Sequence, residues 1–238
     1  MQILLTRALS QVQPLQALLS EQGYQPILFP SLEIKSLNNK PLKVQYDALI
    51  FISANAVEYG LEVFKGLTHS PKIFAVGEAT AKKLEQKGVK VDAFPRQKAS
   101  SEALLAMDEI KVLNNQSILI FRGEGGRETL KQGLEKDNTV EYIEVYQRVP
   151  CHLTSLHRES LSRFLQNDEG IVTATSVENL TALMSMVVKI NMGAITQHPL
   201  VVLSERIKIV AQSLGFKQII ITQKTSDLGL LTAIQTIS

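Results

Sequence analysis

Short apolar runs alternate along this chain with longer segments in which apolar residues recur every three or four positions. The short runs predict β-strands, and the longer segments predict helices that bury one face. The expected strands are Ile3–Leu5, Pro26–Phe29, Leu32–Leu37, Ala48–Ile52, Lys72–Val76, Val89–Phe94, Ser117–Phe121, Val140–Val149, Gly170–Ala174, Leu200–Leu203 and Gln218–Ile221. Regular alternation of strands and helices is typical of parallel sheets covered by helices, so the pattern predicts an α/β protein.

Serine residues mark several of the expected helix starts. The first helix is expected to begin near Ser10, and Ser100 with Ser101 precedes the helix that carries Leu104. Ser226 stands before the last helix. A serine hydroxyl accepts a hydrogen bond from an otherwise unpaired amide of the first turn, which is why serine is favoured at this position.

Composition narrows the class of protein. The chain has 238 residues, of which 45% are hydrophobic and 20% charged, which suits one large globular domain or two small ones. A net charge of +2 without a basic tract argues against nucleic-acid binding. The single cysteine, Cys151, favours a reducing compartment and is interpreted as a small hydrophobe rather than a nucleophile.

The same composition argues against a membrane protein. No apolar stretch approaches the roughly 18 residues of a membrane span. The first residues, MQILLTRALS, lack the basic region of a secretory signal. We therefore expect a cytoplasmic protein with no membrane contact.

Two internal similarities suggest a domain order. Gly77-Glu78 followed by Gly88 resembles Ser204-Glu205 followed by Gly215, and Ile3–Arg7 resembles Ile118–Arg122. The second pair comes first in one copy and last in the other, which a simple tandem duplication would not produce. The order predicts one domain of residues 1–36 plus 150–238 and an inserted domain of residues 37–149, joined by extended strands near 32–40 and 142–149. Chance similarity among strand–helix units is the alternative.

The stretch SILIFRGEGGRE carries the clearest chemical signal. A buried strand, Ser117–Phe121, runs into the turn Arg122–Arg127, and a helical pattern starts at Glu128. Unpaired backbone N–H groups beside two guanidiniums would accept a carboxylate or phosphate. The order of residues fits neither a P-loop nor a dinucleotide fingerprint, and the glycines could serve the turn alone.

Six motifs occur along the chain in a fixed order. They are LLTR at Leu4–Arg7, FISANAV at Phe51–Val57, AVGEATA at Ala75–Ala81, FRGEGGRE at Phe121–Glu128, VYQR at Val145–Arg148 and LSER at Leu203–Arg206. This ordered set covers essentially the whole chain and resembles the uroporphyrinogen-III synthase family. The resemblance implies two flavodoxin-like parallel-sheet domains joined by a two-stranded β-ladder, with a discontinuous first domain. The chain departs from animal members at Ser204–Ile207, where they carry a Gly-Pro-Thr-Thr turn.

The resemblance also implies a reaction. The substrate would be hydroxymethylbilane, a linear tetrapyrrole with carboxylates along its length, and the product uroporphyrinogen III of heme biosynthesis. Such a hydro-lyase removes water from the bilane, inverts ring D and closes the macrocycle without a cofactor. The implied protein is a monomer with a small-molecule substrate and a possible transient contact with the preceding pathway enzyme. A two-domain small-anion binding or sensor protein is the alternative.

Polar residues that follow the expected strands are the candidates for substrate binding, because strand ends gather at one edge of a parallel sheet. They are Thr6, Arg7, Ser53, Asn55, Gly77, Glu78, Arg122, Gly123, Gly125, Gly126, Arg127, Thr175, Ser176, Ser204 and Arg206. Helix capping is an equally good interpretation of Ser53, Thr175 and Ser204. Arg7 and Arg122 could instead be surface charges, and the Glu78 carboxylate is expected to stabilise its helix start.

Tyr146 is the candidate catalytic residue, by its match to the VY motif of the family. A phenol near the leaving hydroxyl could donate a hydrogen bond or a proton, although Tyr146 could instead only pack between the domains. The histidines His69, His152, His157 and His198 lack ligand spacing, so we expect no metal site.

Overall fold

The computed structural model describes residues 1–68, 70–166, 169–188 and 192–237. Its contacts divide the chain into two compact units. Unit 1 comprises Met1–Ile34 and Val149–Ser238, and unit 2 comprises Lys35–Arg148. The chain passes between the units twice, once in β3 (Leu32–Ser36) and once in β7 (Thr139–Pro150), and these strands are neighbours in one sheet.

Unit 1 is built on a parallel sheet with the strand order β10-β9-β8-β1-β2. Its strands are β1 (Gln2–Leu5), β2 (Gln25–Leu28), β8 (Gly170–Ala174), β9 (Leu200–Val202) and β10 (Ile219–Ile221). Counted within the unit, this is the 2-1-3-4-5 order of flavodoxin-like sheets. The two directions of strand addition diverge between β1 and β8, which makes the carboxyl end of that pair the expected binding position.

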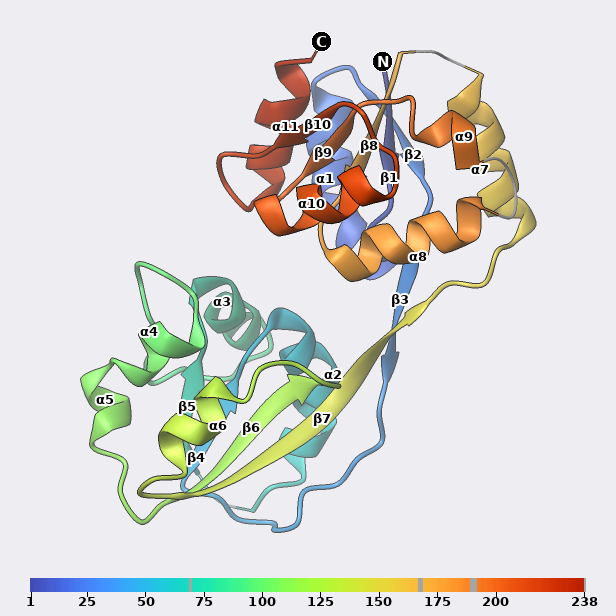
Figure 1. Cartoon of the computed structure of the whole chain (residues 1–238). Coiled ribbons are helices and arrows are strands. Elements are labelled where there is room, and N and C mark those ends of the chain that lie inside the picture. Colours follow the sequence, from blue (N-terminus) through green and yellow to red (C-terminus); the bar gives the residue numbers. More distant parts are fainter. Residues whose placement is uncertain (69, 167–168, 189–191, 238) are drawn as a thin grey trace. The chain divides into compact units, whose positions relative to one another are not determined.

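Helices cover both faces of this sheet (Figure 1). They are α1 (Leu9–Glu21), α7 (Ser155–Leu165), α8 (Val177–Val187), α9 (Met192–Ile195), α10 (Glu205–Ser213) and α11 (Asp227–Gln235). Ile3 and Leu5 pack with α1 and α11, whereas Leu4 packs with α7, α8 and α10. Successive residues of a strand point to opposite faces, so the unbroken apolar run of β1 supplies two cores.

Unit 2 has a second sheet with the strand order β3-β7-β6-β4-β5, in which the strands β5-β4-β6-β7 follow the 2-1-3-4 part of the order in unit 1 and β3 takes the fifth place. Its further strands are β4 (Ala48–Phe51), β5 (Lys72–Ala75) and β6 (Ser117–Gly123), and its helices are α2 (Ala54–Lys65), α3 (Glu78–Gln86), α4 (Ser101–Leu105), α5 (Asp108–Lys111) and α6 (Thr129–Leu134). Pairs β4–β5, β4–β6 and β6–β7 are parallel. Ile50 and Ile120 pack with α4, α5 and α6, while Phe51 stacks on Phe121 on the other face, towards α2. The two mostly parallel sheets with their helices confirm the predicted α/β class.

Two local predictions are wrong. Residues 89–94 form no strand: only Ala93 bridges to Phe74 of β5, because the Asp92 side chain takes the Ile73 amide and Pro95 has no N–H to continue the ladder. The first helix begins at Leu9 rather than Ser10, with Ala8 as an uncapped N-terminal residue. Ser100 and Ser226 do cap their helices, as predicted.

The segment before β4 is held to β7 by a phenol–carboxylate contact. The buried Tyr46 hydroxyl donates to Glu141 Oε2 and accepts the Lys43 amide at 3.1 Å. Glu141 Oε1 accepts the Leu42 amide at 2.9 Å. The pKa of Tyr46 is raised to about 12, mainly by burial and secondly by the hydrogen bond to Glu141.

This raised pKa predicts a loss of stability at alkaline pH. The folded state favours the neutral phenol, so the contribution of Tyr46 is complete below about pH 10 and is lost as the pH rises towards 12. Between pH 9 and 12, the urea midpoint should fall more steeply for the wild type than for Tyr46→Phe. Equal slopes for the two proteins would contradict the assignment.

Candidate active site at the carboxyl ends of the strands

In unit 1 three strand ends are tied together by one buried amide, that of Asn179 in α8. Its Nδ2 donates to Thr6 O at 2.7 Å and to Ser31 Oγ at 2.7 Å. Its Oδ1 lies 2.8 Å from Thr6 Oγ1 and 3.2 Å from the Thr175 amide, both of which donate to it. Asn179 therefore links the residues that follow β1, β2 and β8, at the position where ligands bind in such sheets.

The network determines what the predicted residues of this edge can offer. The Thr6 hydroxyl is buried and shares its hydrogen between Asn179 Oδ1 and Thr173 O, so it is committed within the protein. Ser176 Oγ accepts a hydrogen bond from the backbone N–H of Asn179 and so caps α8. Thr6, Thr175 and Ser176 are thus brought together, but as parts of a hydrogen-bonded frame rather than as free side chains.

Two further predicted positions of unit 1 lie near helix starts. Arg7 pairs with Asp227 at the start of α11, with 2.7 Å between Nη1 and Oδ1. Ser204 precedes α10 but its side chain makes no capping bond, so its hydroxyl is not used by the helix. Arg206 is exposed on the first turn of the same helix. Ser204 and Arg206 are therefore more open to a ligand than Arg7 is.

In unit 2, Ser53 and Tyr146 meet at the end of β4. Ser53 Oγ accepts the Ala56 amide at 3.0 Å, which caps α2, and lies 3.2 Å from Tyr146 Oη. Arg148 Nη2 donates to the same Oη over 3.4 Å. Tyr146 is buried, Ser53 and Asn55 are half-buried, and Arg148 is exposed. This cluster is the chemically most suggestive part of the unit, because a phenol and a hydroxyl share one contact.

Gly77 and Glu78 lie at the end of β5. A Cβ atom on Gly77 would collide with Ala99, which explains why glycine stands there. The exposed Glu78 carboxylate pairs with Lys82 at 2.8 Å, and the hydrogen bond from Lys82 lowers the pKa of Glu78. Glu78 therefore serves its own helix, in keeping with the interpretation from its position at the first turn.

The glycine-rich turn after β6 is organised around Arg122, which is only 3% exposed. Its Nε donates to Gly123 O at 3.2 Å, its Nη2 to Gly125 O, and its Nη1 lies 2.9 Å from Glu128 Oε1. The guanidinium also lies 4.2 Å from the centre of the Tyr142 ring. The buried Arg122 guanidinium is thus bonded to residues of its own turn and of the helix start that follows.

The rest of the turn is also paired with acidic residues. Gly125 and Gly126 have positive φ angles of 70° and 106°, and the Gly125 amide donates to Glu144 Oε1 at 3.1 Å. Arg127 is exposed and pairs with Glu102 at 2.8 Å. The sequence predicts unpaired amides beside two guanidiniums. In the structure both guanidiniums and the Gly125 amide have acidic partners, because a buried cation such as that of Arg122 requires partners within the protein.

Within the described ranges, no group of three His, Cys, Asp or Glu side chains could hold a metal ion. His157 belongs to a capping box with Thr154, and its Nε2 lies 3.0 Å from Pro30 O. His198 Nδ1 lies 3.2 Å from Gly170 O, and His69 lies outside the described residues. The same ranges contain no helix that is long and apolar enough to cross a membrane.

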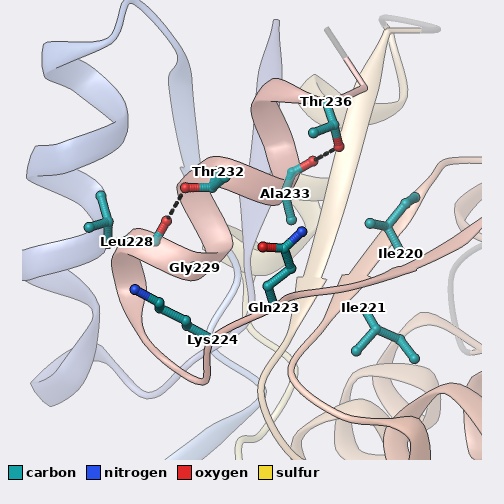
Figure 2. Close-up of a pocket in the computed structure, with 9 residues that line it drawn as sticks. All are labelled: Ile220, Ile221, Gln223, Lys224, Leu228, Gly229, Thr232, Ala233 and Thr236. Carbon is teal, nitrogen blue, oxygen red and sulfur yellow. Dashed lines mark hydrogen bonds between the residues drawn. The ribbon is translucent and has the colours of Figure 1, made fainter.

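A groove of about 400 Å³ lies between β10 and α11, away from the predicted residues. Figure 2 shows Ile220 and Ile221 on one side and Leu228, Thr232 and Thr236 on the helix. Its one lysine, Lys224, sits at the turn before α11. None of the predicted site residues lines this groove, so the strand ends remain the candidate site.

Two mostly parallel sheets with hydroxyl, amide and guanidinium groups at their carboxyl ends define a two-unit α/β protein of the class that binds ligands at strand ends. Comparison with known proteins identifies the family. The family model described as uroporphyrinogen-III synthase HemD matches residues 13–232. The chain belongs to the uroporphyrinogen-III synthase family.

Individual relatives agree with this. The uroporphyrinogen-III synthase of Escherichia coli K12 is 30% identical over 167 residues, which cover 69% of this chain and 67% of the relative. That of Salmonella typhimurium is 30% identical over 168 residues, covering 70% and 68%. The crystal structure of uroporphyrinogen-III synthetase from Helicobacter pylori matches this fold with a TM-score of 0.67 and 18% identity, covering 100% and 99% of the two chains.

Proposed function

We propose that this chain is a uroporphyrinogen-III synthase, a hydro-lyase that converts hydroxymethylbilane to uroporphyrinogen III in heme biosynthesis. The observation that carries the proposal is the family match over residues 13–232, together with relatives that bear the synthase name. These comparisons favour the enzyme over a small-anion binding or sensor protein.

The geometry is compatible with a reaction that needs positioning more than reactive groups. The terminal hydroxyl of the bilane leaves as water, and the electrophilic carbon left behind is attacked by the substituted end of ring D. Ring D then inverts and the macrocycle closes. Since the free bilane closes unaided to the type I isomer, the enzyme must hold the chain in the conformation that directs closure to type III.

We assign the carboxylates of the bilane to the carboxyl ends of the parallel strands, where the predicted binding residues lie. Among the predicted residues, Ser204, Arg206 and Arg127 have side chains open to a ligand or held only by a surface contact. Thr6, Thr175, Ser176 and Arg122 would act mainly by holding backbone amides in place. Binding through amides suits a substrate that carries many carboxylates, because each backbone N–H can donate a hydrogen bond to a carboxylate oxygen.

Tyr146 is the proposed catalytic residue. Its hydroxyl would donate a hydrogen bond or a proton to the leaving hydroxyl, so that the C–O bond breaks with release of water. The support is the shared contact of Tyr146 Oη with Ser53 and Arg148, which gives the phenol a defined orientation.

We further propose that the protein acts in the cytoplasm as a monomer, built of a discontinuous domain and an inserted domain. The bilane is released by the preceding pathway enzyme and closes unaided, so the two enzymes must share a compartment, and a transient contact would shorten the transfer. Light scattering at micromolar concentration would test the monomer, with a dimer mass contradicting it.

The deciding experiment is an isomer assay with hydroxymethylbilane generated in situ. A synthase diverts the product from uroporphyrinogen I to uroporphyrinogen III, whereas a binding protein leaves the isomer ratio unchanged. Formation of type I alone in the presence of folded protein would refute the proposed function.

A further inference from the structure

The strand pairing beside Tyr146 is irregular. Along β6 and β7 the partners advance together until Arg122 faces Glu144, and then Gly123 faces Tyr146, so that Val145 is skipped. Such a bulge is rare in a parallel pair, and bulges near active sites turn a side chain to a new direction. The Glu124 amide then donates to Tyr146 O at 2.7 Å, which holds the shifted pairing in place.

The bulge brings two successive side chains to one helix. Val145 approaches Gly60 of α2, where a Cβ atom would lie 3.5 Å from its Cγ2, and the ring of Tyr146 lies 5.9 Å from that of Tyr59, also in α2. In a regular strand these neighbours would point to opposite faces. The shift therefore carries the phenol to the α2 side, where Ser53 caps that helix.

Gly123 provides the space that the phenol occupies. A Cβ atom at Gly123 would lie 2.5 Å from Tyr146 Cζ, 2.6 Å from Cε2 and 2.9 Å from Oη. Gly123 lacks the positive φ of Gly125 and Gly126, so its backbone does not require glycine. A side chain at this position would therefore clash with Tyr146, and the atoms it would meet are those at the hydroxyl end of the ring.

Polar contacts complete the arrangement from the other side. Ser53 Oγ lies 3.2 Å from Tyr146 Oη, and Arg148 donates to this oxygen over 3.4 Å with its guanidinium carbon 5.4 Å from the ring centre. Because the arginine can only donate, it occupies a lone pair of the phenol oxygen. The hydroxyl hydrogen of Tyr146 is left for Ser53 or for a ligand.

We propose that Gly123 is a positioning residue for the Tyr146 phenol, and that the first glycine of the turn is required for catalysis rather than for anion binding. This inference rests on the proposed function and deepens it. Three motifs that are far apart in the sequence, at Ser53, Gly123 and Tyr146, then serve one hydroxyl group.

The test is a double-mutant cycle in the isomer assay, with Gly123→Ala, Tyr146→Phe and both together. Gly123→Ala should lower kcat for type III formation about tenfold, as Tyr146→Phe does, with KM changed less than about twofold. In the Tyr146→Phe protein, adding Gly123→Ala should lower kcat by less than about twofold, because no hydroxyl remains to be displaced.

Controls separate this role from general damage. Gly193→Ala in α9 introduces a methyl group that meets no atom within 4 Å among the described residues, apart from its chain neighbours and its own helix backbone, and it should retain wild-type kcat. If Gly123→Ala does not fold, Ser53→Gly takes its place, since glycine is tolerated as a helix cap. Ser53→Gly should lower kcat about threefold with Tyr146 present and leave it unchanged with Phe at that position.

The outcomes are distinct. Wild-type kcat for Gly123→Ala, or effects that multiply in the double mutant, would overturn the positioning role while leaving the proposed function intact. A wild-type protein that forms only the type I isomer would instead refute the proposed function itself.

Discussion

Tyr146→Phe is expected to slow formation of uroporphyrinogen III by about tenfold or more, the lower range of acid–base contributions. The change removes the only atom of Tyr146 that contacts Ser53 and Arg148 by hydrogen bonds, and it leaves the buried ring in place. Because the ring is retained, the unfolding temperature should change little. The measurement is kcat for the type III isomer, with the type I fraction recorded in parallel.

Tyr24→Phe is the matched control. Tyr24 packs at the edge of the core formed by α1 and α11, and loss of its hydroxyl should leave kcat within about twofold of the wild-type value. Wild-type turnover in Tyr146→Phe would remove Tyr146 from the mechanism. An equal loss in both variants would point to a general effect of removing a tyrosine hydroxyl.

Asn179→Ala is expected to destabilise the protein by about 3 kcal/mol, because its side chain makes four hydrogen bonds in a buried network and each contributes roughly 0.5–1.5 kcal/mol. The Thr175 amide would lose its bond to Asn179 Oδ1. The Thr6 carbonyl and the Ser31 hydroxyl would each lose one bond to Asn179 Nδ2 and keep the bond between them. Urea unfolding followed by circular dichroism measures the change as a lower midpoint with an unchanged slope.

Asn39→Ala provides the comparison for this variant. The exposed Asn39 side chain donates to Glu144 O at 2.9 Å, and its loss should cost less than about 0.5 kcal/mol, as for most surface substitutions. Equal destabilisation by the two substitutions would mean that the network around Asn179 contributes no more than a surface hydrogen bond.

Much of the fold could be predicted from the sequence, because strands buried on both faces are continuous apolar runs. Ile3–Leu5 and Ser117–Phe121 are examples, and both form central strands. Helix α7 was missed although Thr154 and His157 form a capping box at its start, because histidine takes the place usually held by Glu or Gln. The run at Val89–Phe94 was misread, since alternating residues do not reveal whether a partner strand is available.

For the candidate site, the sequence predicted only the positions of residues and not the contacts of their side chains. Arg122 was expected to face a ligand because it follows a buried strand, whereas its guanidinium turns back to Gly123, Gly125 and Glu128. Asn179 was not predicted at all, because an asparagine near a helix start is usually a surface residue. Its role depends on Thr6 and Ser31, which are far from it in sequence and adjacent to it in the folded unit.

The amino-acid sequence by itself determined the α/β class, most strands and several helix starts, since these depend on periodicity and on contacts between residues a few positions apart. The tertiary structure alone decided which polar groups are used inside the protein. The bulge that aligns Gly123 with Tyr146, and the contact of that phenol with Ser53, arise from the pairing of distant segments. A local pattern carries no information about such pairing, because the free energy that selects it comes from packing across the sheet.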